Sequence, residues 1–181
     1  MPLQYGEENI RRVLLMGSRE HEILARLLDT VGDGTGTKNM AAAAATYRIK
    51  PPVGEVYLIH NIFANILDDA PIDMDGWGGI AALANGCKFE IRRQEAASPA
   101  VVVRDLTDGQ PMKDNLQLSR FGRLETQSGA TGCIIHVDFK LPAIRLDGDR
   151  GESLVFQTQD NLAALVRQEV SVAGLRCQQT A

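Results

Sequence analysis

The stretch from Thr131 to Asn161, TGCIIHVDFKLPAIRLDGDRGESLVFQTQDN, carries the clearest structural signal in the chain. Apolar residues occupy every second position from Ile135 to Leu141, and the same alternation returns at Leu154 and Phe156. A period of two is typical of strands with one face in a core. The DGDRGE segment at 147–152 supplies the aspartates and glycines that a tight reversal needs. The stretch therefore predicts antiparallel β-hairpins.

Other segments repeat this pattern along most of the chain. They are TYRIK at 46–50, GEVYLIHNIFANILDD at 54–69, ALANGCKFEIRRQ at 82–94, PAVVVRDL at 99–106 and LAALVRQEVSVAGLRC at 162–177. The segment at 54–69 is apolar on both faces, which favours a central strand. With about seven or eight strands between turn signals, the sequence predicts a mainly β protein with a jelly-roll-like β-sandwich.

The N-terminal part has a different pattern. Large apolar residues lie near helical spacing within 7–31, so we expect at least one helix, although Gly17-Ser18 interrupts it and an extended arm is the alternative. This apolar stripe must be covered by the sandwich or by another subunit. The expected divisions are an arm at 1–31, a Gly- and Ala-rich linker at 32–45 and the sandwich at 46–181. The expected docking residues of the arm are Val13, Leu14, Leu24, Leu27 and Leu28.

The composition is that of a soluble globular protein. Hydrophobic residues make up 44% and charged residues 23% of the chain, and the formal net charge is −4. Because affinity for phosphates depends on clustered lysines and arginines, we expect no nucleic-acid partner. The N-terminus lacks the order of a signal peptide, and no apolar run is long enough for a membrane span. We therefore expect synthesis in the cytoplasm and no membrane association.

No residue pattern predicts a catalytic centre, a cofactor or a metal site. Cys87, Cys133 and Cys177 are widely separated, and we expect them to be buried small hydrophobes. The acidic residues within 68–75 and the aspartates at 147 and 149 raise the alternative of calcium, but ordinary turn chemistry is the favoured interpretation. A pair of carboxylates of the kind found in glycosidases is left open, since only distance defines such a pair.

Two loops are candidates for partner contact. Trp77 lies among glycines and has the amphipathic character of an interface anchor or a sugar-stacking residue. The long polar segment at 107–130 is of a length that is usually functional or mobile. Its apolar residues Leu116, Leu118 and Phe121 are the expected contacts.

Several segments resemble virion proteins of tailed bacteriophages. They are DGTGTKN at 33–39, PPVGEVYLIHNI at 51–62, DGWGGIAALANGCKFEI at 75–91, RDLTDGQPMK at 104–113 and AIRLDGDRGESLVFQTQDNLAAL at 143–165. The resemblance covers most of the chain after residue 32. It implies a structural component of the virion with a β-sandwich or jelly-roll fold, and it carries over no catalytic residues.

The favoured hypothesis is a non-enzymatic capsid decoration or cement protein that stabilises a phage head. Its expected partners are the major capsid protein or other virion proteins and further copies of itself, as a cyclic oligomer and most plausibly a trimer. The first alternative is a tail or head-to-tail adaptor or fibre component. The second is a carbohydrate-binding β-sandwich that uses Trp77 and the Asp-rich loop.

Overall fold

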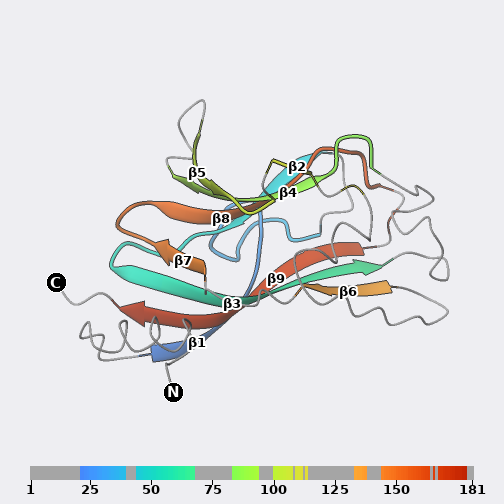
Figure 1. The fold of residues 1–181 in the computed structure, drawn as a ribbon. Helices are drawn as coiled ribbons and strands as arrows, with labels where there is room; N and C mark the ends of the chain where they lie inside the picture. Colours follow the sequence, from blue (N-terminus) through green and yellow to red (C-terminus); the bar gives the residue numbers. More distant parts are fainter. Residues whose placement is uncertain are drawn as a thin grey trace, which may run out of the picture.

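The protein is mainly β, with two antiparallel sheets. A computed structural model describes residues 21–39, 44–67, 83–93, 100–107, 109–111, 113, 133–137, 144–163, 165 and 167–178. These residues form nine strands and no helix. Figure 1 shows the two sheets as an upper and a lower layer. The expectation of a mainly β fold is confirmed.

The lower layer, which we call sheet A, is built around two long strands. Its members are β1 (His21–Leu27), β3 (Glu55–Leu67), β6 (Cys133–Val137), β7 (Ile144–Asp147) and β9 (Arg167–Gln178). Their order is β1-β9-β3-β6, and β7 also pairs with β3. The strands β6 and β7 follow one another along a single edge of β3, at 62–66 and 56–59 respectively. The expected central strand is thus β3.

The upper layer, sheet B, has four strands. They are β2 (Ala45–Ile49), β4 (Cys87–Arg93), β5 (Val101–Asp105) and β8 (Glu152–Thr158), and their order is β2-β8-β4-β5. Within it Phe89 of β4 lies directly opposite Phe156 of β8, with ring centroids 4.6 Å apart. Cross-strand aromatic pairs of this kind stabilise a sheet beyond the area they bury.

The larger of two hydrophobic clusters in the described residues joins the two sheets. Sheet A contributes Leu24, Tyr57, Ile59, Ile62, Ala64, Ile144, Leu146, Val170 and Val172, and sheet B contributes Tyr47, Ile49, Cys87, Phe89, Ile91, Leu154 and Phe156. In β2, β7 and β8 the core residues occupy alternate positions, as the sequence pattern predicts. A core shared by both layers makes this a β-sandwich.

A bulge in β3 changes which residues face the core. Ile59 pairs with Gly174 and Asn61 with Ala173, so His60 has no counterpart in β9. The predicted alternation over 54–69 therefore fails at His60. Tyr57 and Ile59 face the core before the bulge, and the core positions after it are Ile62 and Ala64. Local sequence does not reveal a bulge, because the bulge depends on the partner strand.

The helix expected within 7–31 does not extend into residues 21–27, which form β1. This strand pairs along its whole length with β9, so it belongs to the sandwich and not to a separate arm. The apolar residues Leu24 and Leu28 lie in the core. Leucines three or four positions apart favour a helix by their spacing alone, but here Leu24 faces the core from the strand and Leu28 from the residue after it. The part of the arm at 1–20 is outside the described residues.

The described part of the glycine-rich segment after β1 is held by hydrogen bonds within the chain. The carboxylate of buried Asp29 accepts hydrogen bonds from the backbone N–H groups of Val31 and Gly32. The backbone of Asp29 also forms a bridge with Arg48 of β2. Gly32 has φ of 100°, a conformation that disfavours any side chain. The segment therefore connects sheet A to sheet B across one end of the sandwich.

Candidate functional site

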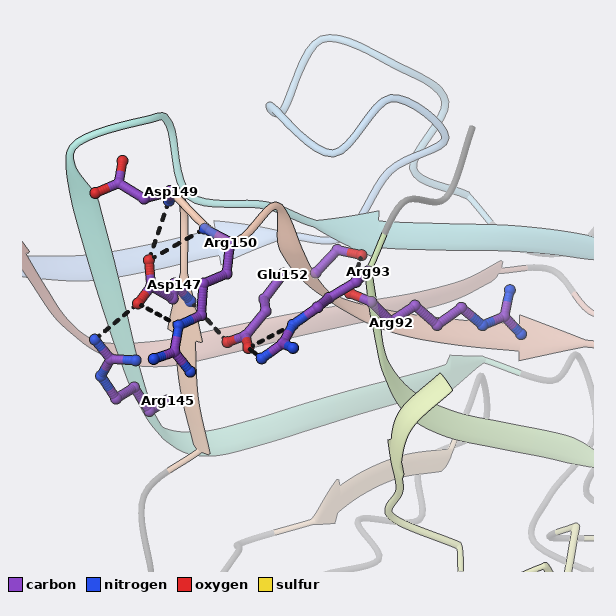
Figure 2. A network of polar contacts seen from close by, with 8 residues as sticks. Arg92, Arg93, Arg145, Asp147, Asp149, Arg150 and Glu152 are labelled. Carbon is purple, nitrogen blue, oxygen red and sulfur yellow. Dashed lines mark hydrogen bonds and ion pairs between the residues drawn. The ribbon is translucent and has the colours of Figure 1, made fainter. Parts of the chain in front are cut away.

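The largest cluster of charged side chains in the described part of the chain lies where β7 passes into β8. Figure 2 shows this cluster, which we call the Asp147 corner. It consists of Arg93, Arg145, Asp147, Asp149, Arg150 and Glu152. The segment DGDRGE does form a tight reversal, but the predicted hairpin is wrong. β7 pairs with β3 in sheet A and β8 pairs with β2 and β4 in sheet B, so the turn crosses between sheets.

Asp147 is the centre of the corner. One carboxylate oxygen accepts hydrogen bonds from the backbone N–H groups of Asp149 at 3.0 Å and Arg150 at 3.4 Å. The other oxygen lies 3.0 Å from the guanidinium of Arg145 and 3.6 Å from Nε of Arg150. The side chain of Asp147 is only 7% exposed. This is the turn chemistry that the sequence predicts for Asp147, reinforced by two cations.

Glu152 connects the turn to sheet B. One carboxylate oxygen accepts hydrogen bonds from Nε and a terminal nitrogen of Arg93, on the neighbouring strand β4. The other oxygen accepts the backbone N–H of Asp147 at 3.1 Å. A planar guanidinium that presents two donors to one carboxylate fixes both groups in orientation. Glu152 therefore links a strand of sheet A to two strands of sheet B.

A second crossing turn, at 50–54 between β2 and β3, packs against the corner. The carboxylate of Asp149 accepts the backbone N–H of Gly54 at 2.7 Å, and Gly148 donates to the carbonyl of Glu55 at 2.9 Å. The approach is so close that a Cβ on Gly148 would lie 1.8 Å from the carbonyl oxygen of Pro52. Only glycine fits there.

The charges and hydrogen bonds of the corner favour a structural role for it. Three arginines and three carboxylates balance in formal charge, and the oxygens of Asp147 and Glu152 are already engaged by donors. Within the described ranges no group of three or more His, Cys, Asp or Glu residues is placed to bind a metal. Buried carboxylates with complete hydrogen bonding rigidify the segment that holds them. We therefore interpret the corner as a clamp between the sheets.

A second feature, at the opposite side of sheet B from β2, is apolar. The strand β5 is the last in the sheet order, and its residues Val101, Val102 and Val103 are 50%, 48% and 43% exposed. The pairing of β4 with β5 shifts register between Ile91 and Arg92, which leaves Val103 as an extra residue. We call these three residues the valine edge. Exposed β-branched residues on an edge strand are typical of a site where another strand adds.

The C-terminal end of β5 is fixed by Asp105. Its carboxylate accepts the backbone N–H of Thr107 at 2.8 Å, the hydroxyl of Thr107 at 2.6 Å and the backbone N–H of Gly109 at 2.8 Å. Burial acts to raise the pKa of Asp105, but these hydrogen bonds, with the charge of Lys88, bring the pKa below its ordinary value. The ionised form of Asp105 thus terminates the strand.

The structure places part of the predicted docking residues. Leu24 and Leu28 are buried in the core, so for these two residues the sandwich itself covers the apolar stripe. Leu27 is half-buried at the end of β1. The remaining residues lie outside the described ones: Val13, Leu14, Trp77, Leu116, Leu118 and Phe121.

Two of the three cysteines can be assessed. Cys87 and Cys177 carry thiols and are buried, as the sequence predicts. Burial, with a smaller contribution from Asp160, raises the pKa of the Cys87 thiol far above its ordinary value, and burial also raises the pKa of Cys177. A thiol without thiolate character is a poor nucleophile. The acidic residues within 68–75 lie outside the described residues.

Sequence analysis missed the residues that define both features. Glu152 finds Arg93 at a separation of 59 residues, and local pattern carries no information about such a pair. The segment PAVVVRDL was recognised as a strand, but a run of valines is typical of a buried strand and gave no signal of exposure.

Comparison with protein-family models, with curated proteins and with solved structures found no match for this chain. Among the described residues there is also no helix with the length and apolar character needed to cross a bilayer. The assignment of function therefore depends on the fold and on the two features above.

Proposed function

We propose that the sandwich is a jelly roll and that the protein is a non-enzymatic virion structural protein, namely a capsid decoration or cement protein of a tailed bacteriophage. The observation that carries the proposal is the strand order. When β6 and β7 are counted as one interrupted strand, the ladders pair the first strand with the last (β1 with β9), the second with the next to last (β2 with β8), and so on inward to β4 with β5.

This nested pairing is what results when one long antiparallel hairpin is rolled into two sheets. It also accounts for the remaining ladders, β9 with β3 and β8 with β4, which close each four-stranded order. Jelly rolls recur in viral capsid proteins, lectins and cupins. Fold alone does not define function. The resemblance of the segments at 33–39, 51–62, 75–91, 104–113 and 143–165 to phage virion proteins favours the first of these classes.

The two features of the candidate site suit such a role. A shell component needs a rigid scaffold, which the Asp147 corner supplies by tying the sheets together. It also needs exposed apolar surface that becomes covered on assembly, and the valine edge is such a surface. Binding to the assembled shell then stabilises the shell by mass action.

The test is cryo-electron microscopy of purified particles of the phage that encodes this chain. Density for the sandwich repeated over the capsid lattice is the expected result. Density at one vertex or along the tail would instead support an adaptor or fibre component, and absence from the particle would overturn both.

Lectins share the jelly roll, so carbohydrate binding is the second candidate. It would use Trp77 and the acidic residues within 68–75, with or without calcium. The matched measurement is glycan binding by the intact chain and by Trp77→Ala, with and without a calcium chelator. Binding that disappears in the variant supports this candidate, and equal signals in both proteins exclude it.

A further inference from the structure

We propose that two copies of the protein associate by antiparallel pairing of their β5 strands, so that sheet B of one copy continues into sheet B of the other. The proposal names a surface and an occupant, and it does not depend on the virion role. A pair of this kind has two-fold symmetry, which differs from the trimer expected from the resemblance.

One edge of the β5 backbone has no strand beside it among the residues that the structure describes. β4 pairs with one side of the strand, and no described strand pairs with the other side. In Figure 1 β5 lies along the upper margin of its layer, away from sheet A. An unpaired row of N–H and C=O groups is a template for another strand. Natural proteins protect such an edge with lysine, proline, inward-pointing charge or a bulge; the three positions of the valine edge carry no charge and no proline, and the bulge at Val103 interrupts only part of the strand.

The side chains of the edge are apolar on both faces. Val101, Val102 and Val103 are each about half exposed, and Val101 and Val102, which pair regularly with β4, point to opposite faces. A strand that covered only one face of sheet B would leave one set of these side chains in water. A partner strand in the plane of the sheet contacts both sets, so edge pairing fits the pattern of exposure better than face packing.

The occupant that fits the valine edge is the β5 strand of a second copy of the chain. In antiparallel pairing about a two-fold axis at Val102, that residue lies opposite its own copy and Val101 lies opposite Val103. β-Branched residues are favourable cross-strand neighbours. In the same register the two charged residues of β5, Arg104 and Asp105, lie opposite neither each other nor their own copies, so no like charges of β5 face each other across the pair despite the net charge of −4 on each chain.

The contact is short, and its length limits its strength. The bulge at Val103 and the cap made by Asp105 confine regular pairing to a few residues. Interfaces with small buried area are weak or transient. We therefore expect a dimer that forms with rising concentration and dissociates on dilution, and not an obligate pair.

The test is sedimentation velocity of the intact chain over a concentration series, compared with Val102→Lys and Val53→Lys. Val53 is 83% exposed in the 50–54 crossing turn, so the same substitution there is a matched control. The dissociation constant of the dimer should rise at least tenfold in Val102→Lys and stay unchanged in Val53→Lys. A monomer at every concentration, or an oligomer that Val102→Lys leaves intact, would overturn the proposal.

A second measurement needs no variant. Hydrogen exchange of the unmodified protein, recorded at low and high concentration, should show slower exchange of the amides of 101–105 at high concentration, because pairing protects them. Amides of β1, a terminal strand of sheet A, serve as the internal reference. Protection that grows at β1 but not at β5 would place the self-contact elsewhere and exclude the β5 pair.

Discussion

The Asp147 corner and the valine edge invert the usual distribution of residue types. The corner buries carboxylates, and the edge exposes valines. In the corner each buried oxygen of Asp147 and Glu152 has a donor within the chain, so burial of charge costs little and fixes the geometry. On the edge the exposed apolar groups have no described cover. Buried charged groups with hydrogen-bond partners thus mark the structural clamp, and exposed apolar side chains mark the surface that we propose for interaction.

The largest effect should come from the close approach beneath the corner. In Gly148→Ala the new methyl group would lie 1.8 Å from the carbonyl oxygen of Pro52, so one crossing turn must move away from the other. We expect a loss of about 3 kcal/mol or more in the free energy of unfolding, because backbone cannot yield as a side chain can. Chemical denaturation followed by circular dichroism measures it.

The control for that experiment is Gly151→Ala in the same turn. Gly151 has φ of 62° and nothing within 4 Å of an added Cβ. Its substitution should cost only about 1–2 kcal/mol, from the left-handed conformation alone. Equal losses in the two variants would show that the crossing turns do not pack as described.

The next effect should come from the buried carboxylate. Asp147→Ala removes the acceptor for two backbone N–H groups and leaves Arg145 and Arg150 without their common partner. We expect a destabilisation of about 2–3 kcal/mol. Asp149→Ala, which removes one exposed contact to Gly54, should cost about 1 kcal/mol or less. If Asp149→Ala were the more damaging of the two, the view of Asp147 as the centre of the clamp would be wrong.

Replacement of valine by threonine, once in the core and once on the valine edge, tests the apolar half of the comparison. Val170 is fully buried in β9, and Val170→Thr should cost about 1–3 kcal/mol because it buries a hydroxyl. Val103→Thr on the edge should change stability by at most about 0.5 kcal/mol. Thermal unfolding at a concentration where the protein is monomeric measures both. A large loss from Val103→Thr would mean that the edge is covered within the monomer.

The smallest effect should be a pH dependence at the end of β5. The folded-state pKa of Asp105 is lowered, so its stabilisation is complete above the ordinary aspartate value of about 3.9 and disappears as pH falls through the lower folded value. Asp105→Asn keeps one acceptor oxygen but does not titrate. The melting temperature of the variant should lie below that of the unmodified protein at pH 7, and the difference should vanish in acid. A constant difference across this range would assign the effect to something other than the charge.

Sequence alone predicted the elements whose pattern is local. The alternation at Leu154 and Phe156 gave β8, the segment TYRIK gave β2, and the aspartates and glycines of DGDRGE gave a reversal. These succeed because one core face imposes a period of two on each strand. The same reasoning failed at β1, where Leu24 and Leu28 reach the core in a spacing that also fits a helix.

The Asp147 corner and the valine edge could not be predicted from local sequence, for a different reason. Whether DGDRGE closes a hairpin or crosses between sheets depends on where β3 and β8 lie, which no window of the sequence contains. The partner of Glu152 and the bulge at His60 are likewise set by strands distant in the chain. Exposure of the valine edge follows from the position of β5 in the sheet order and not from its residues.

The position of β9 has a consequence for the way the molecule is made. This strand is the last one described in the chain, yet it lies between β1 and β3 and pairs with both. During translation sheet A therefore cannot form until β9 has left the ribosome. Until then β1 and the long apolar β3 lack the strand that lies between them. Non-local pairing of this kind is slow. The nascent chain thus exposes unpaired apolar strands until β9 has been made, which is the condition under which chaperones protect a chain from aggregation.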